Sequence, residues 1–279
     1  MAGRLSNSLT LVKASVNVLR LDKELMLFPL MSGIATMLVC ATFVAPIVVT
    51  GSWEIFGEEG QMSYLAMAIA FLFYVVQYTV IFFFNAALVG AALIRLDGGD
   101  PTVSDGLAIA SKRIGSIVGY AVIAATVGMI LRMISERAGF LGRIAVGLVG
   151  MAWTFATYLT VPVLVTKDIG PIDAVKESAM VFKRTWGEQV VGNFGMGWAI
   201  FLMMFAWTVV SGALLFFGVS VMPGAIVPVI GIAVVGYIFL ALLGSALNGI
   251  YTAALYRYAM TGEMGSFDAQ IMGSAFRPK

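Results

Sequence analysis

The sequence predicts an all-α fold, a polytopic transmembrane helical bundle of six spans. Of the 279 residues, 60% are hydrophobic and 11% are charged, whereas about a quarter of the residues of a soluble domain are charged. A helix of about 20 apolar residues crosses the hydrocarbon core of a bilayer. Because only short loops separate such stretches, we expect residues 1–279 to form a single integral membrane domain. The charge-free stretches lie near residues 25–50, 62–94, 114–131, 144–166, 190–221 and 224–256.

The ends and interiors of these stretches give further expectations. The third stretch is the shortest and is followed directly by Arg132, whose side chain must reach toward the headgroups. The second, fifth and sixth are longer than a bilayer requires, so we expect tilts, kinks or extensions into the cytoplasm. Proline removes a backbone N–H from the helical ladder, and we therefore expect kinks at Pro46, Pro162 and Pro228.

The positions of lysine and arginine predict the orientation, because short loops rich in these residues stay in the cytoplasm. With the N-terminus inside, all basic residues face the cytoplasm except Arg132, Arg137 and Arg143, which lie with Glu136 between the third and fourth spans. We therefore expect a multi-pass protein of the cell inner (cytoplasmic) membrane with both termini in the cytoplasm. Those three arginines fit this orientation poorly, and the alternative is that the third and fourth spans are re-entrant.

Three segments outside the spans have the periodicity of amphipathic helices. They lie near residues 4–20, 101–113 and 171–186, and each precedes two spans. This order predicts a pseudo-threefold repeat of an amphipathic helix followed by a transmembrane hairpin, with all three amphipathic helices on the cytoplasmic face as in parallel repeats. The alternative is three unrelated amphipathic linkers. The apolar positions are Leu5, Leu9, Val12, Val16 and Leu19, then Val103, Leu107, Ala110 and Ile114, then Ile172, Val175, Ala179, Phe182 and Trp186.

Three stretches together resemble a family of bacterial and archaeal multi-pass integral membrane proteins to which no activity is assigned. They read SLTLVKASVNVLRLDKELMLFPLMSGIA, FFFNAALVGAALIRLDGGDPTVSDGL and VPVLVTKDIGPIDAVKESAMVFKRTWGEQVVGNFG. The resemblance covers most of the chain and implies the same fold class, without an activity. More distantly, the basic amphipathic segments look like the membrane domain attached to some glycerophosphoryl diester phosphodiesterases. The catalytic domain of those enzymes has no counterpart in these residues, so the resemblance does not imply hydrolysis.

The composition disfavours several classes of function. Histidine, the commonest general acid or base near neutral pH and the commonest metal ligand, is absent from the sequence. The single cysteine, Cys40, lies in an apolar stretch, so we expect it to pack. The net charge of +2 is too small to predict a nucleic-acid partner. We expect no cofactor, no metal and no enzymatic activity.

Two groups of polar residues are the candidates for contacts with ligands or lipids. The amides of Asn85, Asn193 and Asn248 lie in predicted spans, where they can fasten helices together or contact a solute. The basic residues of the amphipathic helices can attract anionic lipid, at about 1 kcal/mol each near the surface. These basic residues are Lys13, Arg20, Lys112, Arg113, Lys183 and Arg184.

The loop from Leu96 to Pro101 offers two carboxylates, Asp97 and Asp100, beside two glycines. Such carboxylates could hold a divalent cation if more oxygen ligands converged. A turn followed by a capped helix explains the pattern better, because Asp100 or Thr102 could accept hydrogen bonds from the free amides at a helix start.

These observations favour a membrane-organising or partner-binding subunit without catalytic activity. We expect its partners to be membrane lipids together with a second copy of the chain or another membrane protein. The alternative is a permease or channel for a small uncharged or lipidic solute, with a path near Asn85, Asn193 and Asn248. An enzyme that acts on lipid is a third alternative.

Overall fold

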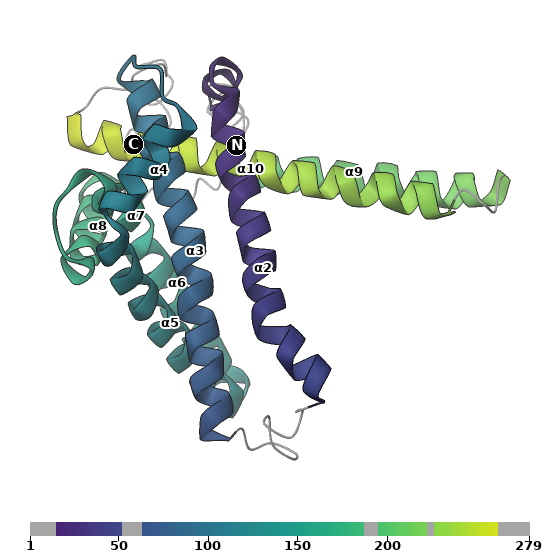
Figure 1. The fold of residues 1–279 in the computed structure, drawn as a ribbon, viewed down its shortest axis with the longest axis horizontal. Coiled ribbons are helices and arrows are strands. Elements are labelled where there is room, and N and C mark those ends of the chain that lie inside the picture. Colours follow the sequence, from purple (N-terminus) through teal and green to yellow (C-terminus); the bar gives the residue numbers. More distant parts are fainter. Residues whose placement is uncertain (1–14, 52–62, 187–194, 222–225, 262–279) are drawn as a thin grey trace. The chain divides into compact units, whose positions relative to one another are not determined.

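The computed structural model describes residues 15–51, 63–186, 195–221 and 226–261, and each of its secondary-structure elements in these ranges is a helix (Figure 1). Residues 15–21 are helical and lead into a short 3-10 helix, η1 (Lys23–Met26). The others are α2 (Leu27–Thr50), α3 (Tyr64–Leu96), α4 (Val103–Lys112), α5 (Ile114–Arg137), α6 (Phe140–Thr157), α7 (Thr160–Thr166), α8 (Pro171–Trp186), α9 (Gly195–Val221) and α10 (Ile226–Thr261).

The predicted fold class is confirmed: within the described residues the protein is all-α and has six helical stretches long and apolar enough to cross a membrane. The fourth stretch consists of α6 and α7 together, whereas each of the others has a single long helix at its centre. These stretches are Lys23–Thr50, Tyr64–Leu96, Ile114–Arg137, Phe140–Thr166, Gly197–Phe217 and Ile226–Thr261.

Helix α5 runs past Arg132, where we ended the third span, and continues to Arg137. Helix α6 then begins at Phe140, so the expected loop of basic residues is only a two-residue connection. The helix tolerates its charges because the Nε atom of Arg132 donates to the Oε1 atom of Glu136, one turn later, at 2.8 Å, a spacing that stabilises helices. The first charged residue therefore marks the end of the apolar stretch, but the helix continues beyond it.

The fourth span is broken between α6 and α7. Leu159 leaves helical geometry, with φ −102° and ψ 11°, three residues before Pro162. Proline cannot donate to the preceding turn and clashes with the carbonyl four residues earlier, so the expected kink at Pro162 takes the form of a break. By contrast, α2 is helical through Pro46. Pro228 lies in the first turn of α10, where a missing N–H costs little.

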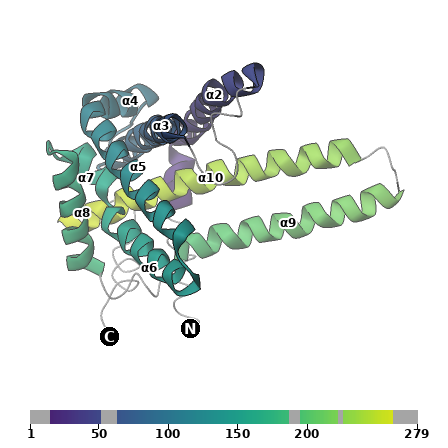
Figure 2. The ribbon, with the colours of Figure 1, turned by 90° about the horizontal axis from the view of Figure 1, so that it is seen from below.

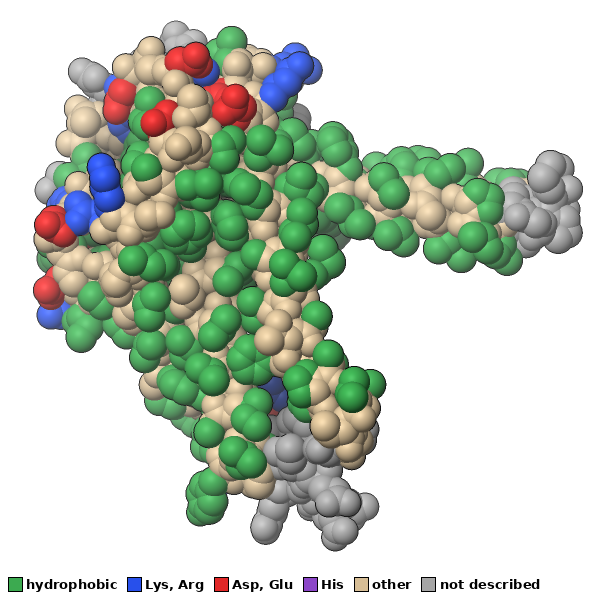
Figure 3. Space-filling view, viewed as in Figure 1, with side chains coloured by type: hydrophobic (Ala, Val, Ile, Leu, Met, Phe, Trp, Pro, Cys, Tyr) green, Lys and Arg blue, Asp and Glu red, His purple; other side chains and the backbone are tan. Residues whose placement is uncertain are grey.

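The chain divides into two compact units, one of which comprises residues 27–91 and 101–185. In this unit α4 approaches α2 and α3 closely at Gly106. A Cβ atom on Gly106 would lie 2.5 Å from the Cζ atom of Phe28 and 2.7 Å from the carbonyl oxygen of Ala87, so this contact requires glycine. Figure 3 shows charged side chains gathered over α4 and α8, and apolar side chains along α2 and α3.

Helix α8 packs beside the break in the fourth span through a buried row of Ala174, Ser178 and Phe182. The Phe182 ring stacks on Phe155 with centroids 5.5 Å apart. Ile172, which we assigned to the apolar face, is 59% exposed, so the buried row is offset from the expected one. The helical segment expected at 4–20 lies mostly outside the described residues, and the threefold repeat stays a prediction.

The second unit comprises residues 1–26, 92–100 and 186–279. Its helices α9 and α10 lie side by side in both ribbon views (Figure 2). The indole of Trp207 in α9 lies where a side chain on Gly236 would be, 2.2 Å from an ideal Cβ position. Its Nε1 atom donates to the carbonyl oxygen of Ala233 at 3.1 Å. A glycine in α10 therefore lets the Trp207 ring of α9 pack directly on the facing backbone.

Candidate functional site

The structure places two of the three candidate asparagines, and Asn193 lies outside the described residues. Asn85 is half-buried in α3, and Asn248 is exposed in α10. Neither amide side chain forms a hydrogen bond with the part of the chain that the structure describes. Their role in helix packing or solute contact therefore stays a prediction.

The candidate lipid-contacting basic residues differ in their surroundings. Arg20, Lys112 and Lys183 are exposed, as contact with headgroups requires, whereas Arg113 pairs with Asp168. Lys13 and the side chain of Arg184 lie outside the described part of the chain. Three of the six candidates are therefore free to meet anionic lipid.

The end of α3 forms a charged cluster that we did not predict, made by Asp22, Arg95, Asp97, Asp100 and Arg257. The Nη2 atom of Arg95 lies 3.4 Å from the Oδ2 atom of Asp22 and also bonds Asp100. The Nε atom of Arg257, in α10, lies 2.9 Å from the Oδ1 atom of Asp97, and its Nη1 atom donates to the carbonyl oxygen of Leu96 at 2.8 Å. The cluster joins three separate segments of the second unit.

Asp22 is the most buried member of the charged cluster, with its side chain 4% exposed. Burial raises the pKa of this carboxyl above its usual value, although the Arg95 guanidinium opposes the shift. Among the described residues, the basic groups bonded within the cluster are Arg95 and Arg257, whose side chains are 20% and 15% exposed. The arrangement can anchor helix ends. None of its residues resembles an activated nucleophile, and the cluster does not resemble the ligand set of a metal.

The loop after α3 is a turn and a helix cap, as the sequence favoured. Both of its carboxylates bond arginines, and Gly98 has a φ of 88°, which glycine adopts readily. Thr102 caps α4: its Oγ1 atom accepts from the Asp105 amide at 3.3 Å, and the Asp105 carboxylate accepts from the Thr102 amide at 2.9 Å. Hydrogen bonds from Thr102 lower the pKa of Asp105.

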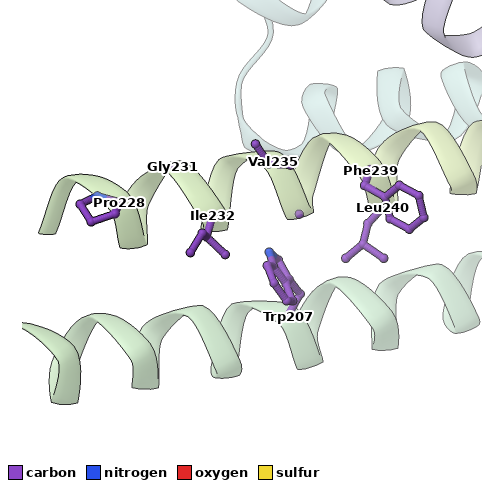
Figure 4. Close-up of a pocket in the computed structure, with 8 residues that line it drawn as sticks. Trp207, Pro228, Gly231, Ile232, Val235, Phe239 and Leu240 are labelled. Atoms are coloured by element: carbon purple, nitrogen blue, oxygen red, sulfur yellow. The ribbon is translucent and has the colours of Figure 1, made fainter. Parts of the chain in front are cut away.

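An apolar groove of about 730 Å³ runs along the α9–α10 hairpin (Figure 4). We call this the hairpin groove. Trp207 projects from α9 toward α10 at its centre, and the other lining residues all come from α10. The indole N–H of Trp207 already donates to Ala233, so the lining side chains have no free hydrogen-bonding group. The lining consists of Trp207, Pro228, Gly231, Ile232, Val235, Gly236, Phe239 and Leu240.

A comparison with known protein families shows to which family the chain belongs. A model of a family of unknown function, DUF6159, matches residues 64–267. The chain belongs to this family. The match includes every candidate span of this DUF6159 protein except the first, together with helices α4 and α8. No curated protein and no solved structure matches the chain.

Sequence reasoning missed the charged cluster and the hairpin groove of this DUF6159 protein for different reasons. The cluster depends on pairs such as Arg95 with Asp22, which are 73 positions apart, and pairing at that separation leaves no local pattern. The groove depends on Trp207 lying opposite Gly236. A tryptophan in the middle of an apolar stretch, away from the interfaces where this residue is enriched, was the available signal.

Proposed function

We propose that this chain is a non-enzymatic membrane module that holds lipid and organises it around itself. The observation that carries this proposal is the hairpin groove. The groove lies on two helices whose charge-free stretches are long enough to cross a bilayer. In the bilayer, the groove would be surrounded by lipid hydrocarbon. The protein acts in the cell inner membrane, with both termini in the cytoplasm.

The groove suits a lipid acyl chain better than another class of ligand. Its volume, about 730 Å³, lies in the usual range for ligand pockets. A polar solute would find no hydrogen-bonding partner among the lining side chains, whereas an acyl chain needs none. A helix about 10 Å wide that rises 1.5 Å per residue would fit only about six residues into this volume, which is far short of a span.

The exposed basic residues Lys112 and Lys183 support the second part of the proposal, the organisation of lipid at the inner face. Both lie on interfacial helices, α4 and α8, and each basic residue near an anionic surface contributes about 1 kcal/mol of attraction. A second copy of the chain or another membrane protein is the expected partner, joined through apolar helix surfaces that lipid also covers.

A lipid carrying a photoreactive diazirine in its acyl chain tests the proposal directly. In vesicles, we expect labelling to concentrate on the groove residues Ile232, Val235 and Phe239. Trp207→Ala, which removes the groove's central ring, should change that pattern, whereas Trp198→Ala should leave it unchanged. Trp198 is the matched control because it lies on the same helix, is 57% exposed and does not line the groove. Labelling spread evenly along α9 and α10 would refute the acyl-chain site.

A second candidate function is a permease or channel for a small uncharged or lipidic solute. It is favoured by unmet polar groups in α3: the Gln77 Oε1 atom is buried without a hydrogen-bond partner among the described residues, and Asn85 is half-buried two turns later. Asn85→Leu and Asn248→Leu should then abolish solute flux into vesicles while the protein stays assembled. If vesicles that contain the wild-type protein show the same flux as vesicles without protein, this candidate is excluded.

A further inference from the structure

A small pocket lies between α3 and α5 near the end where α5 terminates. Its volume is about 110 Å³, and it is lined by Tyr74, Tyr78, Ala125, Gly128, Met129 and Arg132. Two of these residues are held in place by hydrogen bonds. The Arg132 Nη1 atom donates to the Tyr74 hydroxyl at 3.1 Å, and its Nε atom donates to Glu136 at 2.8 Å. These two bonds orient the guanidinium toward Tyr74 and Glu136.

The pocket retains unused hydrogen-bond donors. A guanidinium has five N–H groups, and the two bonds of Arg132 leave three of them free. The Tyr78 hydroxyl forms no hydrogen bond with the described residues, and it lies 3.8 Å from where a Cβ atom on Gly128 would be. Gly128 has no side chain to cover this hydroxyl, and both residues line the pocket. A ligand in the pocket would meet a positive charge and a hydroxyl together.

The size and chemistry of the pocket suit a phosphate group. A water molecule occupies about 30 Å³ of liquid, so 110 Å³ accommodates a compact group and excludes a large solute. Two adjacent N–H groups of arginine match two oxygens of a phosphate. Because Glu136 occupies Nε, the free donors lie on the terminal nitrogens of Arg132.

The depth of the pocket points to a lipid. Arg132 lies five residues before the end of α5 at Arg137, or about 7–8 Å along the axis at 1.5 Å per residue. Tyrosines such as Tyr74 and Tyr78 are enriched at the level of the headgroups. Arg137 and Arg143 add positive charge at the same helix ends. These are the arginines between the third and fourth spans that did not fit the positive-inside rule.

We infer that this pocket binds the phosphate of a membrane phospholipid through the guanidinium of Arg132 and the hydroxyl of Tyr78. Tyr74 and Glu136 are positioning residues that hold the guanidinium. The site lies in the unit of residues 27–91 and 101–185, whereas the hairpin groove lies in the other unit. Each assignment can therefore fail without the other.

The test is native mass spectrometry of the full chain, delipidated in detergent and titrated with phosphatidylglycerol. We expect binding of phosphatidylglycerol to exceed that of a glycosyl diacylglycerol with the same acyl chains and no phosphate. Arg132→Gln should weaken it about tenfold, or about 1.4 kcal/mol, and Arg143→Gln less than twofold. Arg143 is the matched control because it is exposed and its replacement changes the net charge equally. Equal loss in both variants, or no preference for the phospholipid, overturns the inference.

Two further arms keep the result interpretable. If Arg132→Gln fails to fold, Tyr78→Phe, which removes a single hydroxyl, should still weaken binding while the melting temperature is kept. If Tyr78→Phe binds the lipid as tightly as the wild-type protein, the Tyr78 hydroxyl does not bind the phosphate. If inorganic phosphate displaces phosphatidylglycerol at equal concentration, the lipid assignment is wrong and the ligand is the free anion.

Discussion

Replacing Ser178 with alanine tests how the break in the fourth span is stabilised. The Leu159 amide lies at the break and donates to the Ser178 Oγ atom at 3.0 Å. Both residues are fully buried. The carbonyl of Phe155, which would accept from Leu159 in a continuous helix, accepts from Tyr158 at 3.3 Å instead. The Leu159 amide therefore depends on a side chain from another helix.

Ser178→Ala leaves that amide buried without an acceptor, which costs about 1–3 kcal/mol. Each kcal/mol lowers the melting temperature of a chain of 150–250 residues by about 2–4 °C, so we expect a fall of roughly 2–12 °C. The assay is thermal unfolding in detergent at one fixed scan rate, together with hydrogen exchange of the Leu159 amide. Exchange at this amide should accelerate in the variant.

Ser111→Ala is the control, because it makes the same chemical change at an exposed position in α4. We expect it to shift the melting temperature by no more than the scatter between preparations. An unchanged melting temperature and unchanged exchange at Leu159 in Ser178→Ala would refute the argument that α8 satisfies the broken span.

Three further predictions concern α4 and the end of α10. Gly106→Ala should destabilise the protein by about 1–3 kcal/mol through overpacking, whereas Gly115→Ala, at a position with no atom within 4 Å, should be neutral or stabilising in the same melts. The pKa of Asp105 is lowered in the folded state, so this carboxylate contributes its full stabilisation when the pH is above its ordinary pKa and loses it as the pH falls through the lowered pKa. Asp105→Asn should remove this part of the acid-induced fall in melting temperature. Arg257→Gln, which leaves the Leu96 carbonyl without this donor, should cost about 1–3 kcal/mol, and Arg257→Lys should recover little of the loss because it lacks the planar fork.

The spans were predictable from sequence because the bilayer imposes a simple length and polarity requirement on each one. The cap of α4 was also predictable, since Thr102 follows a proline and precedes Asp105 by three residues, which is a local pattern. Helix continuation through Arg132 was not, because we ended the span at the first charge. The ion pair with Glu136 that sustains the helix is itself local, and its four-residue spacing could have been recognised.

The rest depended on contacts that leave no local pattern. Ser178 reads as one polar residue on the apolar side of α8, and only the packed structure shows that it faces the amide of Leu159. Likewise, Asp97 and Asp100 suggested a shared ligand, whereas each bonds a different arginine. The Tyr78–Arg132 pocket combines α3 with α5, and nothing in either helix alone indicates that these donors converge.

The bond between Arg257 and the Leu96 carbonyl has a consequence for biogenesis. The two residues are 161 positions apart, and translation at 5–20 residues per second separates their synthesis by roughly 8–32 s. During that interval the end of α3 is already made, while its partner has not left the ribosome. Until α10 is made, water must satisfy the Leu96 carbonyl, so the final helix completes the end of a helix that was synthesised much earlier.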